Sequence, residues 1–360
     1  MIYLLICLLQ MEPVQIISGT ETFRPLGMNV TIRDDGNIYL INEKKQVLHI
    51  NPHGEKVRVF GRQGEGPGEF LAPFYIGSQE DRIWVYDILR GAASFFSLEG
   101  ELLYIHRSER QEGVRNRPLK TSKGWAFVEF IQAESSPAEI LLADESLKTF
   151  SPLLTWSPDW MHPQKMAHGL QKRMGVNPAL ENIHSAISGD GRYLYVSHPG
   201  RSFKISVFDT IERKKVHIIG RNEKLVPFNK DWGQNMLKGH KRAGNGVTVK
   251  LDAPSSFPLI RSMSVLDDCL FVSMWTWEPD HKARYLVLDH HGNHVDLPFK
   301  PENRKRILAI YGKVAWLTGY DDESGEALIL KCSKDQIDGV AAEHSILYEK
   351  TRKLWVPVKL

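Results

Sequence analysis

Five side chains near position 290 are of types that bind metal ions. The segment His290-His-Gly-Asn-His294 carries three histidines, and Asp289 and Asp296 flank it. Imidazole and carboxylate groups suit zinc or copper. However, Asn51-Pro-His-Gly54 and Ser97-Leu-Glu-Gly100 occupy the same place in an internal repeat of the chain. A solvent-exposed hairpin turn therefore explains the segment better, and we predict no metal ligand in it.

Two segments, about 151–188 and 221–262, mix aromatic with basic residues and are too long for simple hairpins. Tryptophan beside a cation suits an anionic or carbohydrate-like ligand or a protein partner. The alternative is that both segments pack as a lid with tryptophan as filler. Trp275 and Trp277 are spaced to share one face of a strand. The candidate ligand-binding residues are Trp156, Trp160, His162, His168, Arg173, Trp232, His240, Arg242, Trp275 and Trp277.

No catalytic motif is recognised in the chain. It contains no GxSxG elbow and no P-loop, and the glycine-rich stretch 61–68 lacks the lysine and the helix that a phosphate site needs. Calcium would require several acidic side chains converging from separate strands, whereas the aspartates mostly occupy turns. We expect no catalytic residue, no metal and no cofactor, and calcium is the alternative kept open.

Composition indicates a globular protein with no nucleic-acid partner and no transmembrane segment. Of the 360 residues, 42% are hydrophobic and 25% are charged, and 46 basic against 43 acidic residues leave a net charge of only +3. The three cysteines, Cys7, Cys269 and Cys332, are too far apart for a disulfide framework. Whether Cys269 and Cys332 pair with each other stays open.

The first residues of the chain resemble a targeting segment. Residues 2–9 are apolar and too short to span a bilayer, and no lysine or arginine precedes them. We predict that residues 1–12 form a signal or leader segment and that the protein is exported to the periplasm or cell envelope. A buried N-terminal strand and a cytoplasmic location are the alternatives.

A unit of three to four strands recurs along the chain. In its clearest copy a tight turn at residues 34–37 leads into an alternating apolar strand, and two further strands follow at 46–51 and 56–60. The six copies begin at Asp34, Glu80, Gly124, Asp190, Asp267 and Tyr311. A spacing that varies from about 40 to 80 residues favours a propeller over a β-solenoid, because a solenoid needs a nearly constant rung.

The repeat predicts the fold class, which is all-β. We expect residues 13–360 to form a single six-bladed β-propeller with an N-terminal strand closing the ring. The strand-like residues 14–17 and 28–32 precede the first copy. One or both would complete a blade with the C-terminal segment and so remove exposed sheet edges.

The link between the first two copies reads Phe60-Gly-Arg-Gln-Gly-Glu-Gly-Pro-Gly-Glu-Phe70-Leu-Ala-Pro73. It resembles the inter-blade signature of NHL repeats, and more closely that of a bacterial six-bladed propeller family related to them. Its glycines permit a sharp turn, Phe70 can plug between blades, and Pro73 suits the start of a strand. The resemblance implies a binding or sensing propeller, often exported, whose ligands meet the loops around the central channel. It implies no fixed reaction.

The sequence thus predicts a non-enzymatic, NHL-like propeller that binds a small molecule, a glycan or a protein through loops at one face of the channel. The alternative is a metal-dependent, lactonase-like hydrolase or lyase on the same fold, so the question of enzymatic activity stays open. A metal site shared by several blades would tie them together, and chelation would then lower stability.

Overall fold

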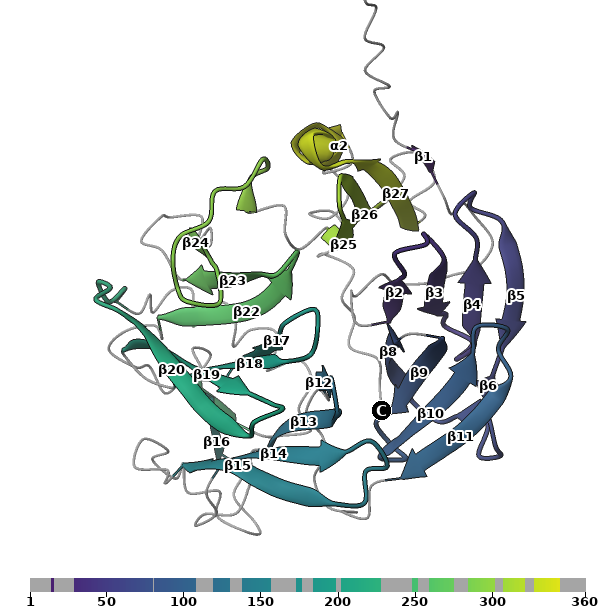
Figure 1. Cartoon of the computed structure of the whole chain (residues 1–360), viewed down its shortest axis with the longest axis horizontal. Helices are drawn as coiled ribbons and strands as arrows, with labels where there is room; N and C mark the ends of the chain where they lie inside the picture. The colour runs from purple at the N-terminus through teal and green to yellow at the C-terminus, as the bar shows by residue number, and fades with distance from the viewer. Residues whose placement is uncertain are drawn as a thin grey trace, which may run out of the picture. The chain divides into compact units, whose positions relative to one another are not determined.

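The computed structural model describes residues 14–15, 29–79, 81–107, 119–129, 138–156, 173–176, 184–198, 202–227, 248–251, 259–274, 284–301, 307–320 and 327–343. Within these ranges the chain forms strands almost throughout, with one short 3-10 turn, η2 (Lys334–Gln336), and one short helix, α2 (Ile337–Glu343). The all-β prediction is confirmed (Figure 1). The predicted leader, residues 1–12, lies outside the described residues, so the leader and export stay predictions.

The described residues fall into two compact units. Unit 1 holds the residues up to Arg107 and from Leu297 onwards, and unit 2 holds those from Leu119 to Asp296. Each unit contains three small antiparallel sheets of three or four strands. Counted over the described residues, the six sheets are the six blades of a β-propeller, as the repeat predicts.

Unit 1 has three four-stranded sheets. The first contains β2 (Val30–Ile32), β3 (Ile38–Ile41), β4 (Val47–Ile50) and β5 (Lys56–Phe60). The second contains β8 (Pro73–Gln79), β9 (Arg82–Asp87), β10 (Ala92–Ser97) and β11 (Leu102–Arg107). The third contains β25 (Ile307–Tyr311), β26 (Val314–Tyr320), β27 (Ala327–Ser333) and β1 (Val14–Gln15). A parallel pair, β6 (Arg62–Gln63) with β7 (Glu69–Phe70), lies between the first two.

The N-terminal strand joins strands from the other end of the chain, as predicted. In β1, Val14 is the register partner of Lys331 and Gln15 that of Leu330, both in β27. The second candidate behaves differently, because Val30–Ile32 forms β2 and pairs with β3 inside the first sheet. One of the two predicted strands therefore completes the C-terminal sheet, and it covers an edge that would otherwise be open.

Unit 2 also has three sheets. The first contains β12 (Leu119–Thr121), β13 (Gly124–Glu129), β14 (Ala138–Asp144) and β15 (Phe150–Trp156). The second contains β17 (Ser185–Ile187), β18 (Tyr193–Ser197), β19 (Phe203–Asp209) and β20 (Lys214–Arg221). The third contains β22 (Ile260–Leu266), β23 (Cys269–Met274) and β24 (Arg284–Leu288). A separate parallel pair is formed by β16 (Arg173–Val176) and β21 (Thr248–Leu251).

Apolar clusters join neighbouring sheets inside each unit. In unit 1, Trp316 of the third sheet packs among residues of the first sheet. In unit 2, Phe208 of the second sheet packs against the first sheet, and Phe203 packs against the third. Alternating apolar residues on both faces of each strand produce these clusters, because successive side chains point to opposite faces of a sheet.

Four of the sheets end their third strand in the same turn. The first residue of the turn accepts a hydrogen bond at its carbonyl from the N–H of the fourth, which has a positive φ. The pairs of first and fourth residues are Asn51 and Gly54, Ser97 and Gly100, Asp144 and Leu147, and Asp289 and Gly292. Leu147 adopts φ +58° where the other turns have glycine. This one residue is why the third copy of the repeat looks irregular in sequence.

The glycine-rich link between the first two copies has the predicted role. Phe70 is only 1% exposed, and its ring centroid lies 6.0 Å from that of Phe96 in a cluster that includes both adjoining sheets. The Arg90 guanidinium donates to the carbonyl oxygens of Glu69 and Gly66 at 2.7 and 3.3 Å. The link is therefore held on one side by apolar packing and on the other by arginine.

Candidate ligand-binding end of unit 2

The sheets of unit 2 have two unlike ends. Because neighbouring strands are antiparallel, the connection from the second to the third strand leaves from the same end as the connection to the next sheet. We call this the insertion end, and its described limits are Glu129, Ala138, Trp156, Ser197, Phe203, Arg221, Met274 and Arg284. The opposite or hairpin end carries the short turns 122–123, 145–149, 188–192, 210–213 and 267–268. Blades are repeated by rotation about one axis, so the same end of each sheet faces the same way.

All ten candidate residues from the sequence belong to connections of the insertion end. Trp156 is the last residue of β15 and Arg173 the first of β16, and only their backbones are described. The other eight lie outside the described residues: Trp160, His162, His168, Trp232, His240, Arg242, Trp275 and Trp277. Their role as ligand contacts stays a prediction.

The two long insertions meet each other. Strand β16 belongs to the first insertion and β21 to the second, and they pair in parallel with Arg173 opposite Thr248 and Val176 opposite Leu251. Both insertions start at the same end of the sheets, so β16 and β21 can pair without either insertion passing from one end of unit 2 to the other. The two predicted insertions are therefore joined through this strand pair.

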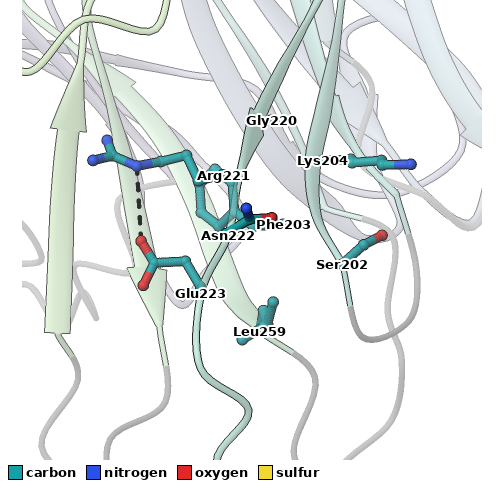
Figure 2. A pocket seen from close by; sticks show the side chains of 8 residues that line it. All are labelled: Ser202, Phe203, Lys204, Gly220, Arg221, Asn222, Glu223 and Leu259. Atoms are coloured by element: carbon teal, nitrogen blue, oxygen red, sulfur yellow. Dashed lines mark ion pairs between the residues drawn. The ribbon is translucent and has the colours of Figure 1, made fainter.

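An open cavity of about 400 Å³ lies at this end, beside the second insertion (Figure 2). Its buried apolar surface comes from Phe203, 1% exposed, and Leu259, 4% exposed. Polar and charged residues form the rest of the lining, which comprises Ser202, Lys204, Gly220, Arg221, Asn222 and Glu223. The cavity thus combines a small buried apolar surface with a lining that is mainly polar and charged.

A carboxylate between two guanidinium groups dominates the charge here. Glu223 Oε1 lies 3.7 Å from Arg221 Nε, and Glu223 Oε2 lies 3.1 Å from Arg284 Nη1. The Glu223 side chain is 12% exposed, whereas the two arginines are 37% and 54% exposed. Arg221 ends β20 and Arg284 begins β24, so the carboxylate connects two sheets and leaves one positive charge in excess.

A histidine and a serine form a close pair near the other edge of the cavity. His198 Nε2 lies 2.7 Å from Ser206 Oγ, and the His198 N–H donates to the carbonyl of Lys204. Burial, together with the Lys204 ammonium group, holds the pKa of His198 below its usual value. A serine activated by a neutral histidine can act as a nucleophile, but Ser206 is only 1% exposed and no substrate can reach it. The pair is structural.

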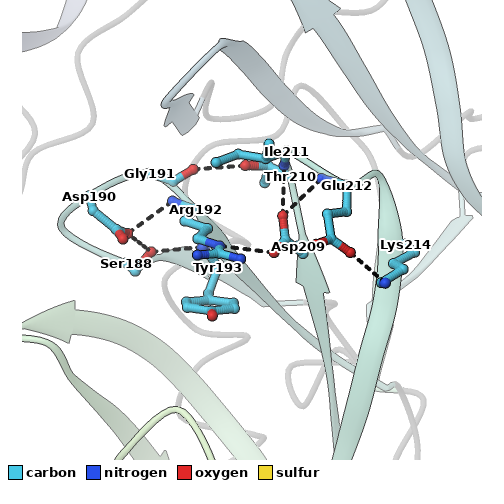
Figure 3. Close-up of polar contacts among 10 residues, drawn as sticks. All are labelled: Ser188, Asp190, Gly191, Arg192, Tyr193, Asp209, Thr210, Ile211, Glu212 and Lys214. Atoms are coloured by element: carbon cyan, nitrogen blue, oxygen red, sulfur yellow. Dashed lines mark hydrogen bonds and ion pairs between the residues drawn. The ribbon is translucent and has the colours of Figure 1, made fainter.

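The hairpin end of the same sheet is closed by its own polar groups (Figure 3). The Asp209 carboxylate accepts from the N–H groups of Ile211 and Glu212 and from Arg192 Nε, each at 2.9 Å. Burial alone would raise the pKa of Asp209, but these donors outweigh it and hold the pKa below its usual value. Thr210 Oγ1 donates to the next turn at Gly191 O. Most of the polar groups drawn there hydrogen-bond or ion-pair with one another.

The histidine segment 290–294 is an exposed turn, as predicted. His290 and His291 are exposed, and Asp289 Oδ1 accepts from the N–H groups of His291 and Asn293. Within the ranges that the structure describes, no group of three or more His, Cys, Asp or Glu side chains is placed to hold a metal ion.

Two further sequence questions concern cysteines and membranes. Cys269 and Cys332 do not form a disulfide bond with each other. Burial raises the pKa of Cys332 to about 11, so this thiol is protonated at neutral pH. The described part of the chain has no helix long and apolar enough to cross a membrane.

Sequence reasoning did not select Phe203, Glu223 or Arg284. Strand alternation over 203–207 does place Phe203 on a buried face. Nothing in the sequence connects Glu223 with Arg284, which lies 61 positions away. This contact depends on how the second and third sheets of unit 2 pack.

No protein-family model matches the chain, and no curated protein matches it. Among solved structures, the chain is similar to a member of the DUF4221 family from Bacteroides vulgatus, with a TM-score of 0.53, 9% identity, and coverage of 90% of this chain and 96% of that one. It is also similar to a putative exported protein from Bacteroides fragilis (TM-score 0.46, 12% identity, 89% and 93% covered). A gluconolactonase from Xanthomonas campestris has a TM-score of 0.41, 13% identity and 85% coverage of both chains.

At these identities the similarity shows the fold alone, and the first of these structures supports the six-bladed propeller over nearly the whole chain. The relation to NHL repeats in particular stays a prediction.

Proposed function

We propose that this protein is a non-enzymatic propeller that binds a small molecule, a glycan or a protein at the insertion end of unit 2. One observation carries the proposal. The long connections of unit 2 leave its sheets at the same end, and two of them are hydrogen-bonded through β16 and β21. The opposite end has only short turns in the described residues. Long loops on a rigid scaffold commonly carry binding residues.

The chemistry of the described residues at this end favours binding over catalysis. The cavity offers exposed cations, an apolar base and small polar groups. The closest approach to a nucleophile, Ser206 with His198, is shut off from solvent. The metal-dependent hydrolase or lyase is the alternative, and no contact of the described residues favours it.

A panel of ligands tests the proposal and the alternative together. Purified protein is mixed with neutral hexoses, hexuronic acids and aldonolactones, each with and without a chelator, and thermal unfolding is recorded. Every ligand is then recovered and analysed for conversion. A ligand that raises the melting temperature in the presence of chelator and is recovered intact supports the binding propeller. Conversion of a lactone to its acid that stops on chelation would establish the hydrolase instead.

A further inference from the structure

Arg221, which lines the cavity, and Arg284, which pairs with the same carboxylate, have more hydrogen-bond donors than Glu223 can occupy. A guanidinium group has five N–H donors, and Glu223 faces Arg221 with one oxygen and Arg284 with the other. In the part of the chain that the structure describes, Glu223 is the only ionic partner of either arginine. Both guanidinium groups therefore retain N–H groups for a second acceptor.

The other residues of the cavity indicate what kind of molecule could carry the second acceptor. Phe203 and Leu259 supply a buried apolar surface, and Ser202 and Asn222 add hydrogen-bonding groups. The exposed ammonium group of Lys204 lies at the other edge of the cavity (Figure 2). The cavity volume of about 400 Å³ is enough for a small organic molecule and too small for a folded partner.

We propose that this cavity binds a carboxylate carried by a ring or another compact body. Arg221 in the lining and Arg284, the second partner of Glu223, would hold the carboxylate, and Phe203 would contact the body. Arginine pairs with carboxylates through two parallel hydrogen bonds, and an exposed guanidinium group at a cavity rim is suited to this geometry. The inference rests on the proposed function, because it names the ligand class of the same end of unit 2.

Glu223 has a second role in this arrangement. It lies within 3.7 Å of both guanidinium groups, so it competes with any carboxylate ligand for their donors and repels it. Removing its charge while keeping its shape frees the arginines. The proposal therefore predicts that Glu223→Gln binds a carboxylate more tightly than the unmodified protein does, although it loses an ion pair.

Titration calorimetry with benzoate and with benzamide tests the proposal. The two probes have the same ring and differ in charge, so we expect benzoate to bind at least tenfold more tightly and its affinity to fall as salt is added. Galacturonate and N-acetylphenylalanine are titrated as well. They distinguish a sugar acid from a peptide carboxyl terminus as the source of the carboxylate.

Three variants separate this reading from a purely structural one. We expect Arg284→Gln to weaken benzoate binding about tenfold and Glu223→Gln to tighten it about tenfold, each confirmed as folded by circular dichroism. Arg213→Gln makes the same change of charge at the hairpin end, where Arg213 is exposed, and should leave the affinity unchanged.

Specific outcomes would overturn the inference. Equal affinities for benzamide and benzoate would contradict it. An unchanged benzoate affinity in folded Arg284→Gln, or a weaker one in folded Glu223→Gln, would also contradict it. No binding of any acid would also overturn it. A neutral sugar that binds at the insertion end in the ligand panel would then still support the proposed function, so the two can fail separately.

Discussion

Asp209 ends β19, and its carboxylate is a buried acidic group at the hairpin end of unit 2. The side chain is 4% exposed and accepts three hydrogen bonds of 2.9 Å, two from turn N–H groups and one from Arg192. Alanine removes all three. Asparagine keeps an oxygen that the N–H groups of Ile211 and Glu212 can use, but it removes the charge that faces Arg192.

The size of the effect follows from these bonds. A hydrogen bond to a charged group contributes about 1.5–3 kcal/mol, but the freed N–H groups of Ile211 and Glu212 are in an exposed turn and can bind water. We therefore expect Asp209→Ala to lower the free energy of unfolding by about 2–3 kcal/mol. Asp209→Asn should lose less than half of that. Lys214→Ala, at an exposed ion pair in the same sheet, is the control and should cause no measurable change.

Equilibrium urea unfolding followed by tryptophan fluorescence measures these differences. The pKa of Asp209 in the folded protein is below its ordinary value of 3.8, so its stabilising effect is present above that pH and is lost as the pH falls further. The difference in free energy of unfolding between the unmodified protein and Asp209→Asn should therefore shrink as the pH falls below 3.8. An Asp209→Ala variant as stable as the Lys214→Ala control would refute this account of the hairpin end.

Two other predictions concern backbone strain and histidine protonation. Lys45 has φ +59°, a backbone conformation that L-residues adopt at a cost in free energy. Lys45→Gly should therefore raise the free energy of unfolding, measured by urea titration, by about 1 kcal/mol. Lys44→Gly is the control and should lower it by about 0.5–1 kcal/mol. If both glycines destabilise alike, the turn is not strained. Burial lowers the pKa of His184 and of His198 from the usual 6.5, so the unfolded chain takes up protons more readily and stability should fall as the pH drops below 6.5. The variant with glutamine at both histidines should lose less stability over that range, and an identical pH dependence would contradict the assignment.

Local patterns predict the fold because each blade is specified by residues close together in sequence. Turn residues such as Gly54 and Gly100, with apolar residues in the strands on either side, are sufficient to place the third and fourth strands of a sheet. The pairing of Val14 with Lys331 joins distant parts of the chain, yet it too could be expected, because closing a propeller leaves few partners for an extra strand.

The candidate site is less predictable because its contacts cross between sheets. The insertions are visible in sequence as stretches too long for hairpins, and the topology brings them to one end. The bridge from Arg221 through Glu223 to Arg284 depends on how the second and third sheets of unit 2 pack, which no local spacing encodes. Aromatic and basic composition therefore predicts a binding site at the insertion end of unit 2, but it does not predict the contacts among the charged residues there.

Hydrogen exchange with and without a bound ligand tests the central claim most directly. Once the panel has yielded a ligand, amide protection is compared at two sets of described segments. The insertion end is represented by 197–198, 202–204, 220–226 and 259–260, and the hairpin end by 188–192, 210–213 and 289–293. Binding at the insertion end predicts new protection in the first set and none in the second. Protection confined to the hairpin end would contradict the proposed site.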